Sequence, residues 1–196
     1  MIRCGTLMRL KQIDRAMPGS FALNPAFFFT FESPKPCNMI IKEPEALYTV
    51  RFSDCDPFGH LNNASYINYF MNAREDHLSA TYNMHLKDYA SKGVGWVVAQ
   101  HQISYLKPAF VAEKVHIFSR VLEFSNNHIL VEMWMTDEAK KKVKAFLWSK
   151  FVHIDLKTGK KAEHDPELLK LLEQIKVEHN GIDTFDQRVG AVLQSF

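Results

Sequence analysis

The sequence predicts a single α+β domain built from one long helix and a mostly antiparallel sheet. A short stretch rich in β-forming residues, 47–52, is followed by a stretch with helical spacing, 65–84. Further strand-like stretches then follow one another at 94–106, 114–124, 128–136 and 142–155. The chain has 196 residues, of which 46% are hydrophobic, so it can bury one sizeable core.

The helix prediction for 65–84 rests on the spacing of its side chains. Apolar or aromatic residues recur at steps of three to five positions, and polar residues occupy the other face. The apolar set is Tyr66, Phe70, Ala73 and Leu78, and the polar set is Asn72, Arg74, Glu75 and Asp76. This pattern is typical of an amphipathic helix, and Gly93 and Gly95 mark the end of the unit.

Turn-forming residues separate the later strands, at 107–109, 125–127, 137–142 and 157–159. After them, Asp165 is a capping residue and Pro166 suits a first helical position, so a C-terminal helix should begin there. A single long helix covers only one face of such a sheet. We therefore expect the other face to be partly covered by a second subunit or by the terminal arms, in a homodimer or homotetramer.

The chain divides into an N-terminal arm at 1–43, a folded domain at 44–180 and a C-terminal tail at 181–196. The arm has no sustained periodicity, and Lys11, Asp14 and Arg15 interrupt the region where a secretory signal would need an apolar centre. An organellar targeting segment and a true translation start near Met39 both stay open. We expect a cytoplasmic protein whose arm contributes little to catalysis.

Composition excludes several classes of partner and cofactor. The formal net charge is +2 without a long single-sign block, which argues against nucleic acid and anionic membranes as partners. The cysteines Cys4, Cys37 and Cys55 lack metal-ligand spacing and are odd in number, so neither a zinc site nor a disulfide framework is indicated. No apolar run approaches the roughly 20 residues of a membrane span. We expect no metal and no other cofactor.

The candidate site is the segment 54–63, Asp-Cys-Asp-Pro-Phe-Gly-His-Leu-Asn-Asn, directly ahead of the helix. A surface turn alone would account for Asp54, Pro57 and Gly59. It would not account for a second carboxylate together with a histidine and two amides between an apolar strand and an aromatic helix. The segment therefore indicates a functional site.

This segment, the aromatic residues Tyr66, Tyr69 and Phe70 and the order of elements resemble the hotdog-fold acyl-CoA thioesterases of the 4-hydroxybenzoyl-CoA thioesterase type. The resemblance covers about residues 46–160, and the segments 103–109 and 151–159 also look like parts of that family. It implies a hotdog fold, in which an antiparallel sheet wraps around one long central helix. It also implies hydrolysis of an acyl-CoA substrate to free acid and CoA, with Asp56 as the catalytic carboxylate and backbone N–H donors at Asn63.

The chemistry agrees with these roles. Thioester hydrolysis needs a carboxylate that attacks the carbonyl or activates water, and donors for the oxyanion that develops. A helix N-terminus supplies such donors, because its N–H groups are unpaired and its dipole end is positive. We expect Asp56, His60 and Asn63 to be catalytic, and Gly59, Asn62 and Tyr66 to contact the substrate.

Other interpretations stay open. The Gly-His-Leu-Asn-Asn form at 59–63 looks more like thioesterases for fatty acyl-CoA or acyl carrier protein than like the aromatic-specific enzyme. A second branch of thioesterases carries its catalytic Glu within the helix, but Glu75 lies among charged neighbours as a solvated residue would. A non-catalytic acyl-CoA-binding module with the same fold is the alternative outside enzymes.

Overall fold

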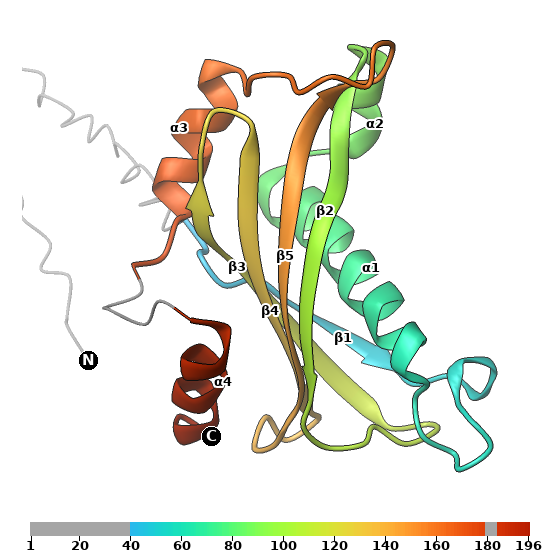
Figure 1. The fold of residues 1–196 in the computed structure, drawn as a ribbon. Helices are drawn as coiled ribbons and strands as arrows, with labels where there is room; N and C mark the ends of the chain where they lie inside the picture. Colours follow the sequence, from blue (N-terminus) through green and yellow to red (C-terminus); the bar gives the residue numbers. More distant parts are fainter. Residues whose placement is uncertain (1–39, 179–183) are drawn as a thin grey trace, which may run out of the picture. The chain divides into compact units, whose positions relative to one another are not determined.

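Five antiparallel strands form one sheet in the order β1-β3-β4-β5-β2 (Figure 1). The strands are β1 (Glu45–Thr49), β2 (Val94–Tyr105), β3 (Lys114–Phe124), β4 (His128–Asp137) and β5 (Val143–Asp155). The computed structural model describes residues 40–178 and 184–196. They belong to the second of the two units into which the chain divides, Met1–Cys37 and Asn38–Phe196. The arm predicted at 1–43 lies almost wholly outside the described residues, so its boundary stays a prediction.

Helix α1 (Asn63–Tyr82) packs diagonally across one face of this sheet, which we call the inner face (Figure 1). Its buried apolar residues are Tyr66, Tyr69, Phe70 and Ala73. Alternate residues of the central strands meet them, since side chains on a strand point to opposite faces in turn. The set from β3 to β5 includes Ile117, Val121, Val131, Met133, Met135, Ala145 and Leu147. The predicted α+β class is thus confirmed, and so is the succession of one strand, a long helix and four further strands along the chain.

Two shorter helices lie near the ends of α1 and the sheet. Helix α3 (Pro166–Ile175) begins as predicted, because the Asp165 carboxylate accepts the N–H of Leu168 at 2.7 Å and Pro166 follows the cap. Helix α2 (Leu86–Ser91) was not predicted, and its N-cap residue His85 forms no side-chain capping hydrogen bond. In residues 40–178 and 184–196, no helix is long and apolar enough to cross a membrane.

Part of the segment predicted as a C-terminal tail forms helix α4 (Phe185–Gln194), which begins at a Thr184 cap. Its apolar residues Phe185, Val189 and Val192 are buried against the outer face of the sheet. The sheet residues in this second cluster are Trp134, Val143 and Phe146. The chain's own C-terminus therefore covers part of the face opposite α1.

An ion-pair network fixes α4 to that outer face. Glu132 of β4 is fully buried, and Arg188 of α4 donates to its two carboxylate oxygens from Nε at 2.8 Å and from Nη2 at 3.1 Å. Arg120 Nε donates at 2.6 Å and Trp148 Nε1 at 2.9 Å. A buried carboxylate is tolerated only when its charge and lone pairs are satisfied, and here four donors do so.

Replacing Glu132 by Ala should therefore destabilise the protein strongly. The change leaves Arg120 and Arg188 as neighbouring cations that have lost their shared carboxylate, and breaking a buried pair in this way costs about 3–5 kcal/mol. Urea unfolding should show this loss. The matched control is Glu138→Ala, which breaks the exposed pair with Lys114 and should change stability by no more than about 1 kcal/mol. Equal effects of the two substitutions would contradict the role of the network.

A buried histidine of α1 makes stability depend on pH. His77 is 2% exposed, and its Nδ1 lies 2.8 Å from Ser119 Oγ. Burial, and secondarily the nearby Arg74 cation, lowers the pKa of His77 to about 4. Burial and the proximity of His153 also lower the pKa of His164. Both imidazoles are therefore neutral in the folded protein at pH 7.

The free energy of unfolding should fall as pH drops from about 6.5 to about 4, because in that window the unfolded chain binds more protons than the folded one. His77→Gln removes the largest part of this difference, so its stability should vary less with pH, while His164 retains some dependence. Urea titrations at several pH values test this. His85→Gln, outside the core, serves as the control, and an unchanged slope in His77→Gln would contradict the assignment.

Candidate active site

The loop between the short 3₁₀ turn Phe52–Asp54 and α1 closes on itself. Cys55 and Leu61 pair as an antiparallel bridge, and inside it the Asp56 N–H donates to the His60 carbonyl at 2.8 Å. The Gly59 N–H returns to the Asp56 carbonyl at 3.0 Å, and Gly59 adopts a φ of 75°. This left-handed conformation is one that glycine adopts without steric cost. Gly59 therefore shapes the loop that presents Asp56.

The Asp56 carboxylate is held by this loop through one oxygen only. Oδ1 accepts the N–H of Phe58 at 2.9 Å and the N–H of His60 at 3.1 Å. Oδ2 has no hydrogen-bond partner within the part of the chain that the structure describes. Asp56 lines a cavity of about 260 Å³ at the N-terminus of α1. Its carboxylate is thus oriented by backbone donors and keeps one oxygen for a ligand.

The first turn of α1 leaves one N–H donor beside this carboxylate. Asn62 is the N-cap, and its side chain accepts the N–H of Ala64 at 2.9 Å, while its carbonyl accepts the N–H of Ser65 at 2.8 Å. Among the described residues, the N–H of Asn63 has no partner. Asn63 lines the same cavity as Asp56, at the positive end of the helix dipole. A carboxylate residue and a residue with an unpaired backbone N–H therefore line one cavity.

Four of the six predicted site residues line this cavity: Asp56, His60, Asn63 and Tyr66. Gly59 and Asn62 do not line it, because Gly59 shapes the turn and the Asn62 side chain caps the helix. Substrate contacts by these two residues stay predictions. The remaining lining residues were not nominated from the sequence, and they are Leu61, Tyr105, Leu106, Lys107 and Pro108. Leu61 belongs to the candidate segment 54–63, and the other four belong to the family-like segment 103–109, for which no role was predicted.

Two tyrosines form part of the cavity wall. Tyr66 Oη accepts the N–H of Ala109 at 3.1 Å, which leaves its own proton free to be donated. Burial raises the pKa of Tyr66, so the phenol stays protonated at neutral pH. The ring of Tyr105 packs edge-to-face on Tyr66 with centroids 5.3 Å apart, and its hydroxyl donates to the Asn63 carbonyl at 2.9 Å. Strand β2 and the start of α1 are joined at this point.

His60 contacts the carboxylate through its backbone and not through its ring. The ring packs edge-to-face on Phe110, with centroids 4.9 Å apart, and forms no hydrogen bond with the described residues. The backbone of His60 pairs with Phe110 as an isolated bridge. A catalytic role for the imidazole stays a prediction.

The neighbours of Asp56 have structural roles. The Tyr69 hydroxyl donates to Asp54 Oδ2 at 2.8 Å and accepts the N–H of Arg51 at 3.1 Å, which ties the loop to α1. The Cys55 thiol donates to the Arg51 carbonyl at 3.3 Å. Desolvation, and then the carboxylates of Asp54 and Asp56, raise the pKa of Cys55, so it is a thiol at neutral pH and a poor nucleophile.

Lys144 contacts the segment 106–113, part of which lines the cavity. Lys144 is buried at 6% exposure, although it closely follows the predicted turn at 137–142. Its Nζ donates to the Pro108 carbonyl at 2.8 Å and pairs with Glu113 at 2.7 Å. Its carbonyl accepts the N–H groups of Leu106 and Lys107. The segment 106–113 is thereby fixed beside Asp56. Within the described residues, no group of acidic, histidine or cysteine side chains is placed to hold a metal ion.

Comparison with known proteins places this geometry in a family. A model of the thioesterase-like superfamily matches residues 50–172. The long-chain acyl-CoA thioesterase FadM of Escherichia coli (strain K12) is 29% identical over 126 residues, which cover 64% of this chain and 94% of FadM.

Solved structures of other proteins have the same fold as this chain. The probable thioesterase YbaW from Escherichia coli is 28% identical, with a TM-score of 0.59, over 68% of this chain and 98% of that one. The DHNA-CoA thioesterase from Staphylococcus aureus shares the fold at 18% identity, with a TM-score of 0.62, over 78% of this chain and 94% of that one. The hotdog fold expected from the resemblance is confirmed. Since the family model spans more than half of the sequence and includes the Asp56 loop, α1 and the whole cavity wall, the chain belongs to the thioesterase-like superfamily.

Proposed function

We propose that this protein hydrolyses acyl-CoA thioesters to the free acid and CoA. One observation carries the proposal: Asp56, which has an unpartnered carboxylate oxygen, and Asn63, whose N–H is unpartnered among the described residues, line the same cavity of about 260 Å³. A thioester carbonyl placed between them would meet a carboxylate on one side and an oxyanion donor on the other. This is the arrangement that acyl transfer to water requires.

In the proposed reaction the carbonyl carbon is attacked by Asp56 itself or by a water that Asp56 deprotonates. Negative charge develops on the carbonyl oxygen, where the Asn63 N–H and the helix dipole stabilise it. The C–S bond then breaks, and CoA leaves as a thiolate that takes up a proton. After direct attack, water hydrolyses the resulting anhydride and restores the carboxylate. The Tyr66 hydroxyl is a second donor for the oxyanion or for the leaving group.

The substrate class follows from two further observations. FadM is named as a long-chain acyl-CoA thioesterase, and 94% of its length aligns with this chain. Lys107 is an exposed cation that lines the same cavity, where it can pair with CoA phosphates. We therefore propose an aliphatic acyl-CoA as the substrate. Thiol release measured on parallel panels of acyl-CoA and acyl-carrier-protein thioesters separates this substrate from a carrier-protein substrate.

Asp56→Asn should abolish turnover while leaving substrate binding intact. The amide keeps the size of the side chain but cannot act as nucleophile or base, and positioned proton transfer alone contributes ~10²–10⁴-fold. We expect a fall of at least about a hundredfold in the rate of thiol release from the best acyl-CoA, with folding and particle size unchanged.

Asp54→Asn and Glu75→Gln are the matched controls, because each removes one carboxylate charge outside the proposed reacting pair. Both should retain far more activity than Asp56→Asn. Near-normal turnover of Asp56→Asn would show that Asp56 is neither the nucleophile nor the general base. Binding of acyl-CoA by the unmodified protein without any thiol release would instead identify a non-catalytic binding module.

We also propose that the enzyme is a dimer joined through β2. This strand is an edge of the sheet, and its exposed residues include Val97 at 44% and Val98 at 41% exposure. An exposed apolar edge is a ready template for pairing with another chain. Antiparallel pairing of β2 with its copy would bring the Tyr105 end of one strand, beside its cavity, towards the Val94 end of the other. The proposed site would then lie at a subunit boundary.

Val97→Lys should convert the dimer to a monomer and lower turnover, because a lysine on an edge strand opposes strand pairing. Leu47→Lys is the control, since Leu47 is 52% exposed on β1, the opposite edge of the sheet. Light scattering at micromolar concentration, combined with thiol release, tests both variants. A monomeric and fully active unmodified protein would refute the proposed interface.

A further inference from the structure

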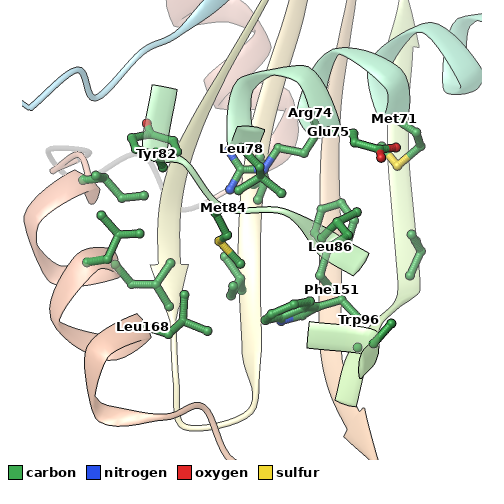
Figure 2. A pocket seen from close by; sticks show the side chains of 18 of the residues that line it. Met71, Arg74, Glu75, Leu78, Tyr82, Met84, Leu86, Trp96, Phe151 and Leu168 are labelled. Atoms are coloured by element: carbon green, nitrogen blue, oxygen red, sulfur yellow. The ribbon is translucent and has the colours of Figure 1, made fainter. Parts of the chain in front are cut away.

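A second and larger cavity lies at the other end of α1. It has a volume of about 410 Å³ and opens between α1, α2, α3 and strand β2, with the inner face of β4 and β5 behind it. Its walls are mainly apolar, and they include Met71, Leu78, Met84, Phe151 and Leu168 (Figure 2). None of its lining residues also lines the cavity of Asp56. The size falls within the range of about 300–1,000 Å³ that small-molecule sites occupy.

One buried cation lines this apolar cavity. Arg74 projects from α1 beside Leu78 and is 7% exposed (Figure 2). Among the described residues its only hydrogen-bond partner is Ser119 Oγ, at the long distance of 3.4 Å, and it forms no ion pair with them. Ser119 already lies 2.8 Å from His77, and the Asp76 carboxylate accepts the Tyr48 hydroxyl. Glu75, adjacent to Arg74 on the helix, also lines the cavity, but its side chain is exposed and forms no ion pair with Arg74.

An unpaired cation in such a place is unusual, because burying a charge without a partner is costly. Burial lowers the pKa of Arg74 to about 10, so the guanidinium remains charged at neutral pH. Its planar set of N–H donors matches a carboxylate, which it can bind through two parallel hydrogen bonds. The cavity thus offers an anion-binding group surrounded by hydrocarbon.

We propose that this cavity binds the anion of a free aliphatic carboxylic acid, with the carboxylate on Arg74 and the hydrocarbon chain along the apolar walls. The carbonyl of an acyl thioester and the hydroxyl of a fatty alcohol carry no charge, so neither group can form an ion pair with the guanidinium at the end of the hydrocarbon chain. The site therefore selects the acid over its neutral derivatives. This inference goes beyond the proposed hydrolysis, although the acid is of the class that such hydrolysis releases.

Binding of dodecanoate and of 1-dodecanol to the full-length protein tests the proposal. Titration calorimetry gives both affinities, and the fluorescence of Trp96, which lines the cavity, reports occupancy. The acid should bind at least about tenfold more tightly than the alcohol, which is the factor expected for hydrogen bonds to charged groups. Equal affinities would overturn the proposal and leave a cavity for any hydrocarbon chain.

Arg74→Met should weaken dodecanoate binding by at least about tenfold and leave dodecanol binding unchanged, because methionine keeps an unbranched apolar chain without the charge. Lys87→Met is the control, since it removes an exposed cation of α2 that does not line the cavity. Dodecanoate binding by Arg74→Met at the affinity of the unmodified protein would refute the role of Arg74. If Arg74→Met does not fold by circular dichroism, the comparison of acid and alcohol on the unmodified protein decides.

A further variant separates this site from the proposed catalysis. Asp56→Asn lacks the proposed catalytic carboxylate, which lines the other cavity. It should bind dodecanoate with unchanged affinity, whether or not the unmodified protein hydrolyses thioesters. A loss of dodecanoate binding in Asp56→Asn would place the acid in the Asp56 cavity and overturn the proposal.

Discussion

The packing of α1 against the inner face of the sheet is the constraint on which the rest of the structure depends. The apolar side of α1 is buried on β3, β4 and β5, which fixes both the axis and the rotation of the helix. Its N-terminus is then held beside the end of β2, where Tyr105 bonds to the Asn63 carbonyl. Its C-terminal half faces α3 across the larger cavity. Both cavities thus owe their position to one packed helix.

Elements with a regular local pattern could be predicted from the sequence, and elements that depend on distant contacts could not. Strand β3 was predicted with the boundaries that it has, and the Asp165–Pro166 start of α3 was correct, because alternation and capping are local signals. Helix α4 was taken as a tail. Its apolar residues Phe185, Val189 and Val192 find their partners only on strands some forty residues or more away in the sequence.

In the candidate site, too, the residues of one short segment could be predicted, and those that depend on distant contacts could not. Asp56 and Asn63 belong to one short segment, so their proximity could be inferred from the sequence. Residues 105–108, which also line the cavity, lie at and beyond the end of β2, more than forty residues away in the sequence. Their proximity to Asp56 depends on the tertiary fold and could not be inferred from the local sequence. Arg74 was assigned to the solvated side of the helix, and this was wrong, because the residue is buried at the edge of the apolar stripe. Periodicity places a side chain around the helix axis, but it does not show how far the neighbouring elements extend over it.

The attachment of α4 has a consequence for how copies of this chain can stack. Trp134 and Phe146, the aromatic surface that a second sheet would need for face-to-face packing, are already covered from within the same chain. Exposing them would require Glu132 to give up Arg188, one of the two cations that neutralise it in the sheet. Back-to-back packing of the sheets of two copies is therefore blocked at this patch of the outer face.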